Sequence, residues 1–204
     1  MESARSLGKN KIGFAGGFYY NRFPIPVDSL TSDYDRRNQS QVYFDFDFRL
    51  GVLKNLDIGI KYKFPFSSGI DTKYQFIGTK QSRIALAIGA SVIRSFGDGI
   101  SVYKNDTDNQ DFKLPKNIIT IPLLFSYYNN PFHSFFVPQY SIILDKSRSD
   151  AEKHQFIGGT FGWAIRNNHV EFKAGISYFE SLNTTFHNKR HLFGMSLGYS
   201  YFFD

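Results

Sequence analysis

The charged residues of this 204-residue chain are spaced in a way that places opposite charges on one face of a sheet. In 41–52 and 56–64, carboxylates and cations alternate with apolar residues. Successive side chains of a strand point to opposite faces, so the charged groups share one side. Buried charges persist only when they are paired and hydrogen-bonded, and the two signs here nearly balance. The pattern predicts a salt-bridged polar interior or a narrow polar channel, lined by Asp45, Asp47, Arg49, Asp57, Lys61, Lys63, Asp71, Lys73, Glu171 and Lys173.

The five histidines are the obvious candidates for catalysis. His187 and His191 fall in or near one expected loop, where Ser181 or Glu180 would be available to complete a hydrolytic site. No spacing in the chain matches a hydrolase motif. We therefore predict that the protein is not an enzyme, and an enzyme acting on lipid or peptide at this rim is the alternative.

No metal or cofactor is predicted. Segment 105–111 offers oxygen ligands at alternate positions, as calcium loops do, but it has neither the glycine nor the distal glutamate of an EF-hand. The chain has no cysteine, which excludes thiolate ligands and disulfides. Its net charge of +6 is spread without a long basic run, so no nucleic-acid partner is expected.

These side chains belong to a chain that alternates in ten segments. No stretch approaches the roughly 20 continuous apolar residues of a membrane-spanning helix. Instead, apolar residues recur with a period of two, as in strands with one apolar face. The expected strands are about 11–22, 41–52, 56–64, 70–78, 83–92, 117–128, 134–144, 157–165, 170–178 and 193–204.

The connections between these segments also alternate in length. Those after the second, fourth, sixth and eighth strands are short, whereas 23–40, 65–70, 95–116, 145–153 and 180–190 are mostly longer and polar. Short turns at one rim and long loops at the other are typical of transmembrane β-barrels. We predict an all-β fold: a closed antiparallel up-and-down barrel of about ten strands over 11–204, preceded by a polar lead-in, 1–10, of a composition typical of tethers.

Alternation alone does not say which face of the barrel points outward, because a soluble barrel such as a lipocalin has its apolar face inside. Three features favour a membrane barrel with its apolar face outward. The apolar faces are long, glycines lie among the charged residues of the opposite face, and the strand ends are aromatic. Aromatic residues at strand ends form girdles at the two interfaces. The predicted girdles are Tyr20, Phe64, Phe66 and Tyr178 on the loop side, and Phe125, Tyr127, Trp163, Tyr199, Tyr201 and Phe203 on the turn side.

The last strand, Phe193 to Asp204, resembles the closing strand of bacterial outer-membrane β-barrel proteins. It alternates without a fault and carries Phe203 just before its end, although Asp204 departs from the usual final aromatic. The resemblance implies a Gram-negative outer membrane, contact with the lipid bilayer and lipopolysaccharide, insertion by the barrel-insertion machinery, and a monomer. Residues 1–5 carry no secretory signal, and we interpret Met1 as standing on a mature sequence.

Pro122 and Pro138 lie in two neighbouring expected strands. Proline cannot donate to a ladder, so two of them in one hairpin are expected to weaken strand pairing. The arrangement resembles the proline-flanked lateral gaps of lipid A palmitoyltransferase barrels, which implies a possible lateral gap; ordinary bulges are the alternative. The sequence as a whole predicts a structural or surface-interaction barrel, or a narrow porin-like channel.

Overall fold

The computed structural model describes residues 4–24, 38–64, 67–79, 81–95, 117–144, 153–167, 169–182 and 191–203. These residues contain no helix that is long and apolar enough to cross a membrane. They form the strands β1 (Ile12–Pro24), β2 (Asn38–Leu53), β3 (Leu56–Phe64), β4 (Ser67–Ile77), β5 (Ile84–Ser95), β6 (Asn117–Asn129), β7 (Phe132–Leu144), β8 (Lys153–Asn167), β9 (Val170–Ser181) and β10 (His191–Phe203).

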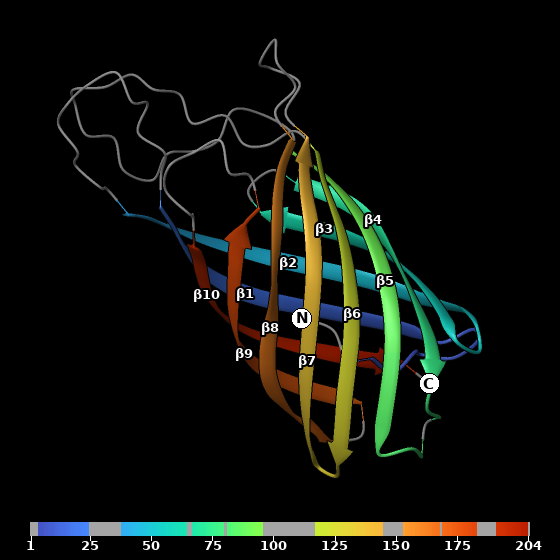
Figure 1. Ribbon diagram of the computed structural model, residues 1–204. Helices are drawn as coiled ribbons and strands as arrows, with labels where there is room; N and C mark the ends of the chain where they lie inside the picture. Colours follow the sequence, from blue (N-terminus) through green and yellow to red (C-terminus); the bar gives the residue numbers. More distant parts are fainter. Residues whose placement is uncertain are drawn as a thin grey trace, which may run out of the picture.

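The ten strands form one closed barrel in which each strand pairs antiparallel with its neighbours in sequence (Figure 1). The ring is completed between the first and last strands, where Ile12 lies opposite Phe203 and Arg22 lies opposite Phe193. Closure leaves no free sheet edge, which a membrane-spanning sheet requires. The structure confirms the predicted ten-stranded up-and-down barrel.

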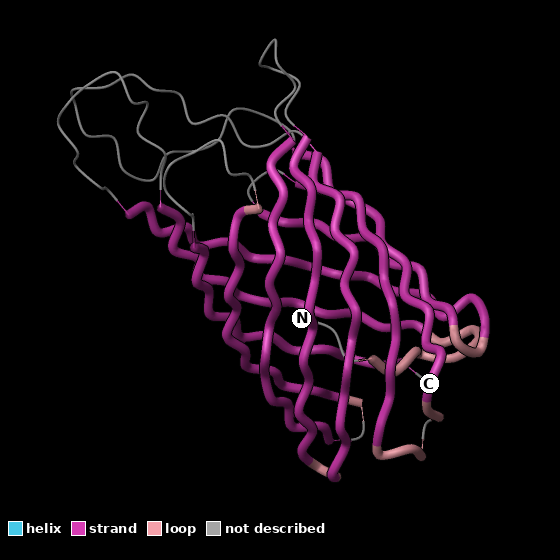
Figure 2. Tube along the Cα trace, in the orientation of Figure 1, coloured by secondary structure: helices cyan, strands magenta, loops and turns pink. Residues whose placement is uncertain are grey.

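Short connections gather at one end of the barrel, which we call the turn end, and the opposite end is the loop end (Figure 2). The turns after β2, β4, β6 and β8 and the start of β1 lie at the turn end. One connection differs from expectation, because β4 begins at Ser67 rather than near residue 70. Ser67 and Ser68 pair with Lys63 and Tyr62, so small polar residues extend the ladder where a longer loop was predicted.

The outer surface of the barrel is apolar. Ile60, Ile70 and Leu197 each expose about 60% of their surface, and phenylalanines alternate outward along β2. A soluble fold would bury these side chains to gain their hydrophobic transfer energy, whereas acyl chains cover them in a bilayer. The exposed face therefore spans the hydrocarbon region, and the inward face is the lumen. The predicted orientation, apolar outward, is the one observed.

The predicted girdle residues that the structure describes lie on this outer face. Phe66 is outside the described residues, and Tyr20 is half-buried. The remaining members expose between 36% and 56% of their surface: Phe64, Tyr178, Phe125, Tyr127, Trp163, Tyr199, Tyr201 and Phe203.

Candidate functional site

The register of β2, β3 and β4 brings the charged residues of the lumen opposite one another. Asp45 lies across from Lys63, and Asp47 lies across from Lys61. Directly opposed residues on one face of a sheet have close Cβ atoms, so opposite charges at these positions attract. The alternating acidic residues of one strand therefore meet the alternating lysines of the next strand.

Arg49 is the centre of the first ionic cluster. Its guanidinium forms an ion pair with Asp71 on β4 and approaches the Asp47 carboxylate at 3.3 Å. The Lys61 ammonium lies 3.6 Å from the same Asp71. Gly59 leaves room for this cluster, because a Cβ at that position would collide with the Asp71 carboxylate. One buried carboxylate thus has two cations for partners.

A second pair lies nearer the turn end, on the same strands. The Lys73 ammonium is 3.2 Å from a carboxylate oxygen of Asp57, and Asp57 is fully buried. These two residues are register partners across β3 and β4. Asp57 also accepts hydrogen bonds from the backbone N–H of Leu7, so the carboxylate has both a cation and an amide donor.

A separate cluster projects from β9 and β7. Glu171 is fully buried, with the Lys173 ammonium 2.8 Å away and Nε2 of His133 at 3.5 Å. The His133 ring stacks on Tyr128, with ring centres 4.7 Å apart. Sequence periodicity alone did not predict a partner for His133, although a period of two places it on the same face as Phe135.

The lumen is not polar all round. On β5 to β8 the inward positions form a buried apolar cluster that includes Ala85, Leu124, Phe135, Val137 and Ala164. The sequence predicted a charged inward face with glycines among the charges, and it did not predict these large apolar residues. The barrel interior therefore has an ionic side and an apolar side.

Residues 4–10, which we call the N-terminal segment, lie inside the barrel at the turn end. The amide of Ala4 donates to Oγ of Ser126 at 2.9 Å, and Ala4 is fully buried. The amide of Ser6 donates to Oε1 of Gln75 at 2.7 Å. Asn10 donates its N–H to the carbonyl of Gly51 at 2.7 Å. The described part of the lead-in thus crosses the barrel from β2 to β6 and does not extend away as a tether.

Arg5 fixes the middle of this segment. Its guanidinium lies over the Tyr128 ring, 3.4 Å from the ring centre, and it donates to the carbonyl oxygen of Ser82 at 2.5 Å. Its own carbonyl accepts a hydrogen bond from Lys73 at 2.7 Å. Burial lowers the pKa of Arg5 below its usual value, because the charged form loses hydration.

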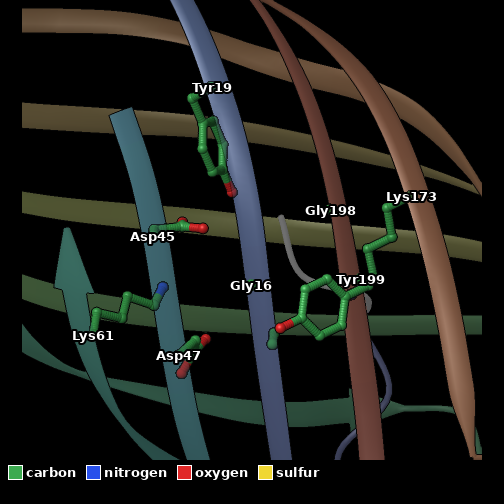
Figure 3. A pocket seen from close by; sticks show the side chains of 9 residues that line it. Gly16, Tyr19, Asp45, Asp47, Lys61, Lys173, Gly198 and Tyr199 are labelled. Carbon is green, nitrogen blue, oxygen red and sulfur yellow. The ribbon is translucent and has the colours of Figure 1, made fainter. Parts of the chain in front are cut away.

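Two small cavities in the described part of the barrel lie beside the ionic clusters. The first, of about 30 Å³, is lined by Asp45, Asp47, Lys61 and Lys173 together with residues of β1 and β10 (Figure 3). The second, of about 40 Å³, lies toward the turn end and is lined by Arg5, Leu7, Arg49 and Lys73 among others. Each has room for only a few water molecules.

The two prolines flank a break in strand pairing on both sides of β6. Between β5 and β6 the pairing is interrupted between Ile88 and Ser91, opposite Pro122. Between β6 and β7 it is interrupted between Pro122 and Phe125, opposite Pro138. The register resumes unchanged beyond each break. The prolines therefore remove ladder contacts without introducing an extra residue.

Most of the residues considered for catalysis and metal binding lie outside the described part of the chain. His187 and segment 105–111 are among them, and the side chain of His191, at the start of β10, is also outside the described residues. Among the described residues, no group of three or more metal-ligating side chains is present.

A closed ring of ten antiparallel strands with an apolar exterior and an ionic interior defines a transmembrane β-barrel, the class found in bacterial outer membranes. No protein-family model and no curated protein sequence matches the chain. This class assignment rests on the topology and the exposed apolar surface.

Among the solved structures similar to this chain are three from two bacterial proteins. Two are of Ail, the attachment invasion locus protein of Yersinia pestis: one in complex with the heparin analogue sucrose octasulfate, at 11% identity and TM-score 0.38, and one at 12% identity and TM-score 0.36, each covering 96% of this chain and 99% of Ail. The third is the outer membrane protein OprG from Pseudomonas aeruginosa, at 15% identity and TM-score 0.37, covering 99% of both chains.

Proposed function

We propose that the protein is a closed outer-membrane barrel that acts through its loop end, as a structural or surface-interaction protein. The observation that carries this proposal is the filled lumen. Its charges are paired across β2, β3, β4 and β9, an apolar cluster occupies the opposite side, and the cavities between them hold only a few waters. A small barrel whose lumen is filled by its own side chains serves as a rigid support that presents its loops for contacts.

The proposed partners follow from this location. The apolar exterior contacts the lipid bilayer, and insertion requires the barrel-insertion machinery. The segment between β1 and β2 contains Arg36 and Arg37, whose guanidinium groups suit the phosphates of lipopolysaccharide. The barrel acts as a monomer in this proposal, since closure satisfies all of its strand edges.

Surface labelling tests the proposed role of the loop end. The chain has no cysteine, so an introduced one is a unique reporter. Asp108→Cys, between β5 and β6, is expected to react with a membrane-impermeant maleimide on intact cells. The matched variant Lys54→Cys, at the β2–β3 turn, is expected to react only after the outer membrane is permeabilised. Labelling of position 54 but not 108 on intact cells would contradict the proposal.

A narrow channel is the second candidate function, and the two adjacent cavities beside Asp47 and Lys173 favour it. An enzyme acting on lipid or peptide has less support, since the described residues contain no convergent acid–base set. Alanine at His187 and His191 with no loss of any detected hydrolysis would remove that alternative.

A further inference from the structure

The two cavities lie next to each other along one strip of the lumen wall. They share Ala15, Asp47 and Lys173 as lining residues. The wall there comes from the inward faces of β1 and β10, where Ala15 lies opposite Ser200 and Gly17 lies opposite Gly198. These four residues are small, whereas Tyr19 and Phe202, which also line the cavities, are large. The ionic clusters of β2 to β4 and of β9 face this strip from either side.

The N-terminal segment occupies the turn end of this strip. Arg5 and Leu7 line the second cavity, and the Leu7 side chain packs over Gly13. Beyond them the segment continues to Gly8. The Gly8 backbone lies so close to Gly51 that a Cβ atom on Gly51 would overlap the Gly8 carbonyl. The strip is thus closed at the turn end by residues that belong to no strand.

The segment is attached mainly by polar contacts. Ala4 and Ser6 are held by side-chain acceptors of the wall, and Leu7 by the Asp57 carboxylate. Hydroxyl, amide and carboxylate groups can exchange such bonds for bonds to water. Nε of Arg5 is buried and has no hydrogen-bond partner among the described residues. Displacing the segment therefore exchanges protein hydrogen bonds for hydration. It also removes Ala4 from the apolar cluster and the Arg5 guanidinium from the Tyr128 ring.

We infer that the strip beside β1 and β10 is an ion-conducting path that the N-terminal segment closes, and that its displacement opens the path to small inorganic ions. The strand residues that line the two cavities give this path a charged wall. Each of its four cations, Arg49, Lys61, Lys73 and Lys173, is paired with a carboxylate, so the wall carries both signs. This inference rests on the proposed closed barrel and adds a conducting state to it.

Single-channel recording in planar bilayers tests the inference. The full-length protein is expected to show no steady conductance in potassium chloride. A variant lacking residues 2–10 is expected to show discrete openings in the same salt. Heat-modifiable migration in gels checks that the truncated barrel is folded. A folded truncated barrel that conducts no more than the full-length protein overturns the inference.

A point substitution gives the same test without shortening the chain. Gly51→Val places a side chain against the Gly8 backbone and is expected to produce openings like those of the truncation. Ala174→Val adds a comparable volume on the exposed outer face of β9 and is expected to remain closed. If both variants are folded and equally silent, the segment does not control conduction.

A cysteine pair checks where the segment lies in the membrane. Ala4→Cys with Ser126→Cys joins positions whose N and Oγ atoms are 2.9 Å apart, so a disulfide is expected to form on oxidation of the reconstituted barrel. Absence of the cross-link overturns the inferred closure. Steady conductance of the full-length protein contradicts the closed barrel itself, whereas silence of the folded truncation contradicts only the conducting path.

Discussion

At the residue scale, one buried carboxylate of the lumen pairs with more than one cation. This is Asp71, which contacts both Arg49 and Lys61 and is almost completely buried. Removing one member of a buried ionic group leaves its partners without compensation, and that loss exceeds the net value of the pair itself. The stability of the barrel is therefore sensitive to this one side chain.

Asp71→Asn is expected to lower the free energy of unfolding by about 3 kcal/mol, because it leaves Arg49 and Lys61 short of a negative charge in the lumen. Urea unfolding in lipid vesicles, followed by the fluorescence of Trp163, measures the change. Lys54→Gln, at an exposed turn position, is the control and is expected to stay within about 0.5 kcal/mol of the original protein. A loss below about 1 kcal/mol for Asp71→Asn would show that water screens the cluster.

Alternation in the sequence was enough to group the charged residues on one face, but not to choose their partners. Partners depend on register, and register comes from turn geometry and the whole hydrophobic pattern. The sequence therefore predicted that Asp71 lies in the lumen without predicting its contact with Arg49. The position of Arg5 could not be predicted for a different reason. A short polar segment shows no hydrophobic periodicity that would assign its residues to a face.

At the element scale, β6 is joined to both neighbours less completely than the other strands of the described sheet. We propose that the interrupted pairing beside this strand is a lateral gap, through which a lipid chain reaches the apolar cluster of the lumen. Leu124 and Val137, both buried members of that cluster, lie at the interrupted pairing between β6 and β7. The gap and the apolar cluster therefore lie at the same place in the wall.

Pro122→Val together with Pro138→Val restores two backbone donors and is expected to complete both ladders. Amide hydrogen exchange in the centre of β6 should slow by at least tenfold. For a second measurement, Val137→Trp is introduced in a Trp163→Phe background, so that position 137 carries the fluorophore. Its quenching by brominated phospholipid should fall when both prolines are replaced. Slower exchange with unchanged quenching would mean that the prolines are ordinary ladder breaks and that lipid does not enter there.

Strands and turns were largely predictable, since a period of two and short turns at fixed intervals carry most of the information in a barrel. The start of β4 was the exception. Pro65 and the serines that follow it are typical of a loop, and only pairing with β3 reveals that Ser67 and Ser68 continue the sheet. Tertiary pairing outweighed local preference at that point.

At the scale of the whole molecule, the apolar outer surface of the barrel makes the protein stable in a lipid bilayer. Ile60 lies in the middle of β3 and exposes 59% of its surface. A cation at the midplane of a bilayer costs about 2–4 kcal/mol in barrels of this kind. Ile60→Arg is therefore expected to destabilise the barrel by that amount in vesicles.

The control for this substitution is Ile60→Ala, which removes volume without adding charge and is expected to cost clearly less, because acyl chains fill the space. Unfolding titrations in vesicles of one lipid composition compare the two variants. Equal stabilities of the arginine and alanine variants would mean that position 60 faces water rather than lipid.

The ring is sealed by its first and last strands, and this has a consequence for biogenesis. Every other neighbouring pair is a hairpin that can form as soon as its two strands exist, but β1 must wait for β10. The N-terminal segment lies within the circle that this seam completes. The seam between the first and last strands is therefore the last contact of the ring to form, and once it has formed the earliest described residues lie inside the ring.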